Sequence, residues 1–529
     1  MPSRPTLTAA LLAAGLVLPG LQAAHAAKFR WANDGDANSM DPYARNETFL
    51  LTFTQNFYDP LVRRDKDLKV EPALAESWDQ PDPLTWRFHL RHGVKFHEGQ
   101  PFTADDVVFS YERATQPASQ LNAAFQAVKE VRKVDDFTVD FVTKAPDPIF
   151  VQEITTVAMM SKAWCEAHDA TRTVDLTKIK EENYATRHEN GTGPYILDAR
   201  EPDRRTTLHA NADWWDKMPG NATEVEFDVI SNAATRVAAL LSGDVDMIYT
   251  VPPQDMDRIK GNASLNLLVG PELRTVFLGF DQSRPELINS DVKGKNPFQD
   301  ERVRQAFYQA IDIEAIHKVV MRGQSRPTGL LYGPGINGWT EESDVRWPFD
   351  PAGAKKLLAD AGYPEGFSVT LDCPNDRYVN DAQICQAVTV MLAKIGIKAT
   401  LNAQTKLKYF AQISNPDYNT DFYMLGWTPT TYDAHNSLYN LAGTRNGTRG
   451  VFNDGGWSNA EFDKLLDDIA VETDAARRQA MIVQASKIIH DQAAFIPLHQ
   501  QTLVWATKKI VSLVQPADDT FPLRFVTVK

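Results

Sequence analysis

The chain has 529 residues, of which 43% are hydrophobic, and its formal net charge is −14 at pH 7. That length exceeds one ordinary hydrophobic core, so we expect two or three domains, and the hydrophobic content argues against disorder. The excess of acidic residues argues against nucleic acid or an anionic lipid surface as a partner, because both attract clustered Lys and Arg. An acidic solvated surface keeps a monomer soluble, and we expect a monomer.

The first 26 residues have the pattern of a cleavable Sec-type signal peptide. They contain Arg4 and no acidic residue, an apolar run covers 7–21, and Ala24-His25-Ala26 has the small-x-small form that signal peptidase cleaves. An uncleaved membrane anchor is the alternative, but it needs about 20 apolar residues, and Pro19-Gly20 interrupts the run. No cysteine lies near the cleavage position, so we expect a periplasmic protein that is not a lipoprotein.

Helices and strands mix through the first half of the mature chain. Thr103 and Asp106 have the spacing of a capping box, which predicts a helix that starts there. Trp86, Phe88 and Leu90 alternate and can share one face of a strand. The predicted elements are a strand at 28–32, a helix at 47–61, two strands about a turn at 84–96, a helix from 103 and a strand at 137–141. The turn at 190–194 is a candidate crossing point between domains.

The second half has clearer helical periodicity. Apolar side chains between Ile384 and Ile395 recur at helical spacing, and Gly396 supplies the stop. Predicted helices cover 235–241 with a stop at Gly243, 303–316, 351–361, a segment from 381, a segment behind a capping box at 458–461, and 474–490. Predicted strands cover 245–249, 502–507 and 523–528. The pattern indicates a mixed α/β protein that is neither a parallel barrel nor a sandwich.

The three cysteines suit an oxidising compartment, where two of three can pair. Cys373 ends a predicted strand and Cys385 lies early in a predicted helix, so we expect these two to form a disulfide that stabilises the fold by roughly 3 kcal/mol. Cys165 is then free and buried. No cysteine and histidine residues cluster with zinc spacing, and we expect neither a metal nor a cofactor.

The common catalytic motifs are missing from the sequence. It contains no Gly-x-Ser-x-Gly elbow, no Walker A loop and no His-Glu-x-x-His helix. A nucleophile and base could still be brought together by the fold, so a secreted hydrolase stays open as an alternative. We expect a protein that is not an enzyme.

Several motifs, taken in order, are similar to those of the extracytoplasmic solute-binding proteins of family 5, the peptide, nickel and opine binders of ABC importers. The longest are EPALAESW at 71–78 and TWRFHLRHGVKFHEGQPFTADDVVFS at 85–110. Further matches are SMDP at 39–42, GTGPY at 191–195, LSGDVD at 241–246, RVRQAF at 302–307, AGAKKLLADAGYPEG at 352–366, LAKIGI at 392–397 and Gly426-Trp427. Each is weak by itself, but together they span nearly the whole mature chain.

The resemblance implies an α/β fold of the periplasmic binding protein type II kind, a clamshell of two lobes with an extra domain. Mapped onto this chain, lobe I comprises 27–72, 192–272 and 502–529, the extra domain 73–191, and lobe II 273–501. Two strands cross between the lobes at a hinge. The implied function is to bind a small solute, a short peptide first of all, between the lobes and deliver it to an ABC permease in the inner membrane.

The resemblance also implies where the solute lies. In similar dipeptide binders an aspartate after Gly-Trp pairs with the peptide's amino terminus, but that position is Thr430 here, and a neutral hydroxyl cannot form that charged pair. Asp433 could substitute or could cap a turn. Trp427 is a candidate to cover the solute with its ring, with a core position as the alternative.

Three further candidates come from other segments. Arg377 could bind a solute carboxylate or phosphate, with Tyr378 stacked beside it, or could form a surface salt bridge. Asn46 and Glu47 follow the SMDP motif, which faces the cleft in similar proteins. Glu47 could pair with an amine of the solute. We first interpret it, however, as an ordinary residue in the first turn of a helix.

The solute itself stays open. Thr430 favours a second hypothesis, a non-peptide solute such as an opine or a sugar. A metal–chelator complex is a third hypothesis, with His435 as the candidate ligand.

Overall fold

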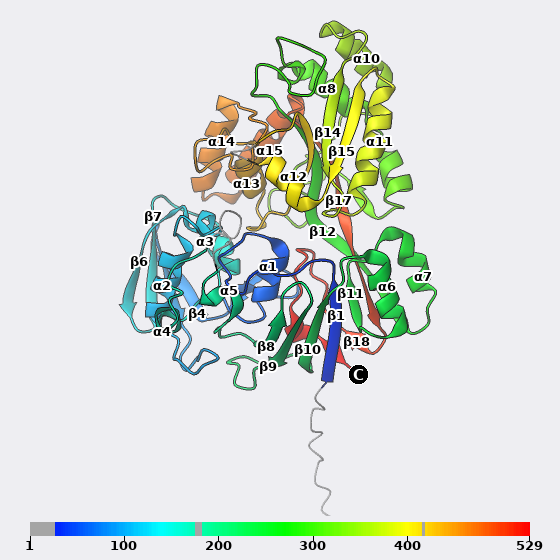
Figure 1. Ribbon diagram of the computed structural model, residues 1–529. Coiled ribbons are helices and arrows are strands. Elements are labelled where there is room, and N and C mark those ends of the chain that lie inside the picture. Colours follow the sequence, from blue (N-terminus) through cyan, green and yellow to red (C-terminus); the bar gives the residue numbers. More distant parts are fainter. Residues whose placement is uncertain (1–26, 175–181, 415–417) are drawn as a thin grey trace, which may run out of the picture.

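The computed structural model describes residues 27–174, 182–414 and 418–529 (Figure 1). Its largest sheet has 11 strands in the order β15-β14-β16-β12-β17-β11-β1-β10-β9-β8, and β13 pairs with β17 off this path. Two long strands in the middle of this order, β12 (Leu265–Phe280) and β17 (Phe495–Lys508), run between the lower and upper parts of the molecule in Figure 1. The predicted signal peptide at 1–26 lies outside the described residues.

The other strands of the large sheet lie on either side of this pair. The lower part holds β1 (Ala27–Asn33), β8 (Tyr195–Glu201), β9 (Arg205–Ala210), β10 (Ala222–Val229) and β11 (Met247–Tyr249). The upper part holds β13 (Ser325–Pro327), β14 (Ser368–Pro374), β15 (Lys398–Gln404) and β16 (Phe422–Trp427). β14 is parallel to both of its neighbours, and β1 is parallel to β10 and β11. Small two-stranded sheets pair β2 (Val62–Arg64) with β3 (Val70–Pro72) and β18 (Val511–Ser512) with β19 (Thr527–Val528).

The pairing of β12 with β17 is interrupted at its centre. Leu265 to Pro271 pair with Lys508 to Thr502, and after a shift in register Thr275 to Gly279 pair with Gln500 to Phe495. The apolar cores separate at the same place: Leu265 packs into a cluster of the lower part, whereas Val276 packs into a cluster of the upper part. The lower part is therefore lobe I and the upper part lobe II. The exact boundaries at 272/273 and 501/502 stay a prediction, and the interruption lies beside them.

A four-stranded sheet forms the extra domain at the left of Figure 1, in the order β4-β5-β7-β6. Its strands are β4 (Ala75–Asp82), β5 (Thr85–Leu90), β6 (Val128–Asp135) and β7 (Thr138–Thr143), and its helices are α2 (Ala104–Ala114), α3 (Phe150–Glu153), α4 (Lys162–Ala167) and α5 (Tyr184–Arg187). Phe88 of this sheet and Trp31 of β1 belong to one continuous apolar cluster. The extra domain is thus packed firmly on lobe I.

The remaining helices cover the large sheet. Lobe I carries α1 (Thr48–Thr54), α6 (Ala233–Ser242) and α7 (Met256–Lys260). Lobe II carries α8 (Glu301–Ala310), α9 (Ile313–Ala315), α10 (Pro351–Asp360), α11 (Asp381–Ala393), α12 (Lys406–Ile413), α13 (Ala434–Ser437), α14 (Ala460–Val471) and α15 (Ala475–Asp491). Among the described residues, no helix is long and apolar enough to cross a membrane.

Local capping explains several of the helix ends. Thr103 donates its backbone N–H to Asp106 Oδ2 at 2.9 Å, so the predicted capping box at α2 is confirmed. Gly243 ends α6 with φ 90°, a left-handed conformation that suits glycine. The predicted box at 458–461 is wrong in its capping residue, because Asn459 and not Ser458 accepts the N–H of Phe462, at 2.9 Å.

Two predicted helices are shorter than expected. The helix predicted at 47–61 ends at Thr54, because Asn56 Nδ2 donates to the carbonyl of Thr52 at 3.0 Å and satisfies the end of the helix there. The helix predicted at 303–316 breaks after α8. Ile311 is extended, and Asp312 then caps the separate helix α9 by accepting the N–H of Ala315 at 2.9 Å.

Two strand predictions also needed correction. The segment 84–96 forms only one strand, because Gly93 turns the chain with φ 76° and β5 pairs with β4 and β7 instead. The segment after it forms a small loop in which Phe96 and Gln100 are hydrogen-bonded. The segment 523–528 begins as a short 3₁₀ turn at Leu523–Phe525 and becomes a strand only at β19.

Candidate functional site

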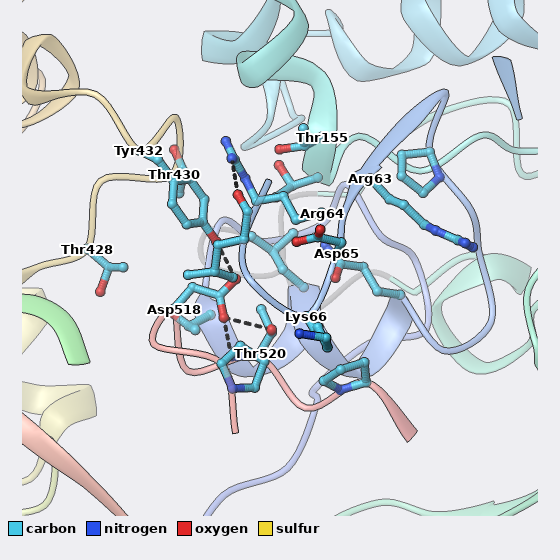
Figure 2. A pocket seen from close by; sticks show the side chains of 18 of the residues that line it. Arg63, Arg64, Asp65, Lys66, Thr155, Thr428, Thr430, Tyr432, Asp518 and Thr520 are labelled. Carbon is cyan, nitrogen blue, oxygen red and sulfur yellow. Dashed lines mark hydrogen bonds between the residues drawn. The ribbon is translucent and has the colours of Figure 1, made fainter. Parts of the chain in front are cut away.

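A cavity of about 100 Å³ lies where lobe I, the extra domain and lobe II meet (Figure 2). Lobe I contributes residues from α1, from β2 and the turn after it, and from the C-terminal segment 516–525. The extra domain contributes Thr155 and Thr156, and lobe II contributes Thr428, Pro429, Thr430 and Tyr432 from the loop between β16 and α13. A site lined by both lobes is where a solute can favour the closed arrangement of a clamshell.

Arg64, Tyr432 and Asp518 form a bridge across this cavity. The guanidinium carbon of Arg64 lies 3.5 Å from the ring centroid of Tyr432, a cation–π contact between lobe I and lobe II. Arg64 Nη2 lies 3.4 Å from the carbonyl oxygen of Thr431. The Tyr432 hydroxyl donates to the carboxylate of Asp518, back in lobe I (Figure 2). The lobes are thus joined twice by one tyrosine.

The backbone holds Tyr432 in an uncommon conformation. Its φ is 58°, in the left-handed region that residues with a Cβ seldom occupy. The Tyr432 N–H donates to the carbonyl of Pro429 at 3.1 Å, and its carbonyl accepts the N–H of Asn337 at 2.8 Å. These bonds fix the loop so that the Tyr432 ring points across the cavity.

The guanidinium groups of Arg64 and Arg524 are partly removed from solvent, and this changes their pKa values. Burial lowers the pKa of Arg64 from its ordinary value. Burial, and then repulsion from the neighbouring Arg63 guanidinium, lowers the pKa of Arg524 to about 10. Arg63 itself pairs with Glu71 at 2.7 Å and with Asp216 at 2.5 Å. The cavity wall in lobe I is therefore rich in guanidinium groups.

A second polar cluster lies at the interruption of β12. Arg274 Nη1 is 2.8 Å from Glu272 Oε1 in an ion pair, and Arg274 Nη2 is 3.8 Å from Asp519 Oδ2. Burial raises the pKa of Glu272, and the nearby guanidiniums of Arg274 and Arg377 oppose that rise. Burial and the proximity of Glu272 raise the pKa of Asp519. Charges from both lobes therefore meet at the crossing strands.

Arg377 and Tyr378 occupy the turn between β14 and α11. Within the described residues, the Arg377 guanidinium makes no hydrogen bond or salt bridge, which leaves its fork of donors available. The Tyr378 hydroxyl accepts the N–H of Gly426 at 2.8 Å. A Cβ at Gly426 would lie 2.6 Å from the Tyr378 ring, so only glycine fits beside it. A disulfide joins Cys373 to Cys385 and closes this turn, and Cys165 is free and buried.

The aromatic and acidic candidates of lobe II are engaged within that lobe. Trp427 is half-buried, donates its indole N–H to Asn436 Oδ1 at 2.9 Å and packs on Phe452. Asp433 is buried, and Arg478 donates to both of its carboxylate oxygens at 2.6 and 2.9 Å. Asp433 also accepts the N–H of His435 and so caps α13. Of the two roles that the sequence left open for Asp433, solute binding and capping, the structure shows the capping role.

The candidates near the N-terminus lie beside the cavity and not in its wall. Glu47 caps α1 by accepting the N–H of Leu50 at 3.1 Å. Asn46 is exposed, and its backbone N–H donates to Gln120 Oε1 at 3.0 Å. Of the positions that the sequence singled out, only Thr430 lines the cavity.

His435 does not present a free pair of nitrogens for a metal. It is half-buried, its Nε2 lies 3.0 Å from the carbonyl oxygen of Leu466, and burial lowers its pKa. In the described part of the chain, no three His, Cys, Asp or Glu side chains lie together as a metal site would require.

Sequence reasoning missed Arg64, Tyr432 and Asp518, and also the pair Glu272 and Arg274. The pair did carry a signal: both residues interrupt an apolar strand at a spacing of two, which places them on one face. Arg64 follows Arg63 on a short strand, so the two point to opposite sides. Nothing local distinguishes Tyr432 or Asp518.

Comparison with known proteins gives a consistent result. Residues 69–449 match the family model described as bacterial extracellular solute-binding proteins, family 5 middle. The chain is 26% identical to the glutathione-binding protein GsiB of Shigella flexneri serotype 5b over 480 residues. This alignment covers 89% of this chain and 88% of that protein.

Solved structures share the fold. A periplasmic binding protein DppA from Helicobacter pylori in complex with the peptide STSA has a TM-score of 0.81 at 24% identity, over 95% of this chain and 98% of that one. AgaA from A. tumefaciens R10 in complex with agropinic acid also has a TM-score of 0.81 at 24% identity, over 95% and 99%.

Proposed function

This chain belongs to family 5 of the bacterial extracellular solute-binding proteins, and from that premise we propose that it is the periplasmic receptor of an ABC importer for a short peptide. The observation that carries the proposal is the cavity between the lobes with its bridge from Arg64 through Tyr432 to Asp518. A receptor of this kind binds its solute, closes, and hands it to the permease unchanged. It is a binder and not an enzyme.

The closing motion follows from the two strands that cross between the lobes. The interruption of the β12–β17 ladder separates two apolar cores, so each lobe can move as a unit about it. A solute that contacts both lobes lowers the free energy of the closed form relative to the open one. The permease then distinguishes a loaded receptor from an empty one by its shape.

Arg377 is the residue that we assign to a carboxylate of the peptide. Its guanidinium is unpaired within the described chain and electrostatically coupled to Glu272 at the base of the lobes. Tyr378 and Trp427 support that part of the site from lobe II, and Asn46 and Glu47 stay predictions for the opposite side. We do not assign Asp433 to the solute, since Arg478 occupies both of its oxygens.

The cavity is smaller than the ~300–1,000 Å³ of a typical small-molecule site. A peptide must therefore enter with the lobes further apart. The proposal includes export by a cleavable signal at 1–26, a free protein that is not a lipoprotein, a monomeric state, and a permease in the inner membrane as the partner.

The test is to identify what the protein carries. The mature protein is purified gently from its native host, and native and denaturing mass spectra are compared. A bound short peptide, glutathione among the candidates because of the relatives' name, supports the proposal. An intact peptide recovered after long incubation also excludes turnover, whereas cleavage products in molar excess over protein would overturn it in favour of a hydrolase.

A second candidate function is a receptor for a non-peptide solute such as an opine. Thr430 favours it, because a neutral hydroxyl lines the cavity at the position of the dipeptide binders' aspartate. A protein with the same fold binds agropinic acid. Recovery of a single opine or sugar in the same spectra would move the assignment to this candidate.

A further inference from the structure

Two arginines in the cavity wall form no salt bridge with the described residues. Arg64 and Arg524 both line the cavity, and neither forms a salt bridge with any residue that the structure describes. Arg524 Nη2 lies 3.4 Å from the carbonyl oxygen of Arg64, so the Arg524 guanidinium lies beside the backbone from which the Arg64 side chain extends. Arg64 Nη1 donates to the carbonyl of Leu68 at 2.9 Å. Carbonyl oxygens hold both guanidiniums in place without neutralising their charge.

The carboxylates that face the same space are already engaged. Asp59 attracts Arg524 electrostatically without forming a salt bridge, and it accepts hydrogen bonds from the indoles of Trp214 and Trp215 at 3.2 and 2.7 Å. Glu71 and Asp216 also attract Arg524, but both pair with Arg63. Asp518 accepts from Tyr432 and from the Thr520 hydroxyl, and although it attracts Arg64 electrostatically it is beyond salt-bridge distance. Asp65 accepts two backbone N–H groups of its own turn, from Asp67 and Lys69.

A donor of Arg64 is left without a partner. Its Nε is buried and makes no hydrogen bond in the described chain, and the same is true of Nη1 in the adjacent Arg63. A buried donor without an acceptor is costly. An acceptor with negative charge that enters the cavity can pair with this donor and offset that cost.

We propose that this wall is a subsite for a carboxylate side chain of the solute, held by Arg64 and Arg524, so that the receptor selects acidic peptides. The inference rests on the proposed function and deepens it by naming the class of peptide. Arginine suits the role because its planar fork can donate two parallel hydrogen bonds to a carboxylate. The burial that lowers the pKa values of both arginines supports the same conclusion.

Arg64 also couples recognition to closure. Its guanidinium lies against the Tyr432 ring of lobe II, so a carboxylate that binds Arg64 sits beside the contact between the lobes. An acidic peptide is then favoured specifically in the closed form.

The experiment uses three pools of tripeptides that share one mixture of neutral residues at the ends. The middle residue is Glu in the first pool, Gln in the second and Lys in the third. The mature protein is incubated with each pool, separated from free peptide by gel filtration, and the retained peptides are quantified by mass spectrometry. Glu and Gln have nearly the same shape, so their ratio isolates the charge.

We expect the Glu pool to be retained at least tenfold better than the Gln pool, and the Lys pool least. In Arg64→Gln and in Arg524→Gln the Glu/Gln ratio should fall at least fivefold. Arg204→Gln is the matched control, because Arg204 is an exposed arginine of lobe I between β8 and β9 whose salt bridge, among the described residues, is to the exposed Glu201. It should keep the original ratio.

The outcomes separate the two proposals. Retention of the pools without preference for Glu, or an unchanged ratio in both arginine variants, overturns the acidic subsite and leaves a peptide receptor. Retention of no pool overturns both. If Arg64→Gln does not fold, Arg524→Gln and the ratio in the unchanged protein still decide the question.

Discussion

The carboxylate of Asp433 has two structural roles within lobe II. It caps α13 through the N–H of His435, and it neutralises the buried Arg478 of α15. Asn337 adds a hydrogen bond to the same carboxylate at 2.7 Å. Although burial alone would raise it, these partners, Arg478 foremost, hold the pKa of Asp433 below its ordinary value. One side chain therefore connects three segments of the lobe.

We predict that Asp433→Asn lowers the free energy of unfolding by about 3–5 kcal/mol at pH 7, because it removes the carboxylate that pairs directly with the buried Arg478. The folded-state pKa of Asp433 is depressed, so the ion pair stabilises the protein above the unfolded value near 3.8 and that stability is lost as pH falls through the lower folded value. The difference between variant and original should therefore shrink below about pH 4. Urea unfolding at pH 7 and at acidic pH measures it.

The control for this prediction is Asp468→Asn. Asp468 pairs with Lys464 on the exposed face of α14, four residues apart, and such pairs contribute less than about 1 kcal/mol. A loss at Asp433 as small as that at Asp468 would contradict the prediction. So would a difference that persists unchanged at acidic pH.

The candidate site illustrates what residue patterns can and cannot predict. Arg377 and Tyr378 follow a strand and precede a helix, and that position alone places them at the end of a sheet where sites form. The bridge of Tyr432 to Asp518 joins residues 86 positions apart. It depends on how the lobes close and on a left-handed backbone at a tyrosine, for which the sequence contains no local signal.

At the scale of elements, the turn from β14 into α11 carries Arg377 and is closed by the disulfide of Cys373 and Cys385. The backbone amides of Arg377 and Tyr378 both donate to Asp381 Oδ2, at 2.9 and 3.0 Å. The disulfide and this first-turn aspartate therefore fix the same short segment.

We predict that the double variant Cys373→Ala and Cys385→Ala loses roughly 3 kcal/mol of unfolding free energy. The two cysteines are 12 residues apart in sequence. A disulfide that closes a loop of this size stabilises the fold by roughly 3 kcal/mol, because it lowers the conformational entropy of the unfolded chain. Unfolding in guanidinium measures it, with and without dithiothreitol. Reductant should destabilise the original protein by the same amount and leave the variant unchanged.

A further effect of reductant on the double variant would contradict this account, since Cys165 is the remaining cysteine and is free. The variant should also bind solute more weakly than the original, because the turn that carries Arg377 gains freedom. Equal affinity would mean that Asp381 alone holds the turn.

Element prediction succeeded where local chemistry decides the outcome. The helix from Asp381 ends before Gly396, and α15 begins behind Asp474, which accepts the N–H of Arg477 at 2.9 Å. It failed where long-range pairing decides. The predicted strand starts at 502, but β17 starts at Phe495, because β12 pairs with it from Phe495 onward and β13 pairs with it from His499 to Gln501.

At the scale of the whole molecule, length predicted two or three domains, and the resemblance to family 5 implied two lobes and an extra domain. They could not predict how tightly the extra domain joins lobe I, because its strands and those of lobe I build one continuous core. The two lobes have separate cores, and the crossing strands and the contacts at the cavity connect them. Relative motion is therefore expected between lobe II and the rest.

Tyr432 is the residue through which this motion can be tested. It belongs to lobe II, and its hydroxyl donates a hydrogen bond to Asp518 of lobe I. Its ring forms a cation–π contact with the Arg64 guanidinium, also of lobe I. We predict that Tyr432→Phe raises the Kd of the co-purified solute about tenfold or more. The variant loses a hydrogen bond to a charged group, about 1.5–3 kcal/mol, in the closed form only, and apparent affinity falls with the population of the closed form.

Tyr332→Phe is the matched control, because the Tyr332 hydroxyl is buried and hydrogen-bonded to Ser486 at 2.7 Å entirely within lobe II. It should lower the free energy of unfolding by about 1 kcal/mol and leave the Kd unchanged. Tyr432→Phe should do the reverse, with a faster release of solute and little loss of stability, because each lobe keeps its own core. Calorimetric titration and stopped-flow release measure the two effects. If Tyr332→Phe weakened binding as much as Tyr432→Phe, the loss would reflect the stability of lobe II, and the bridge would have no special part in closure.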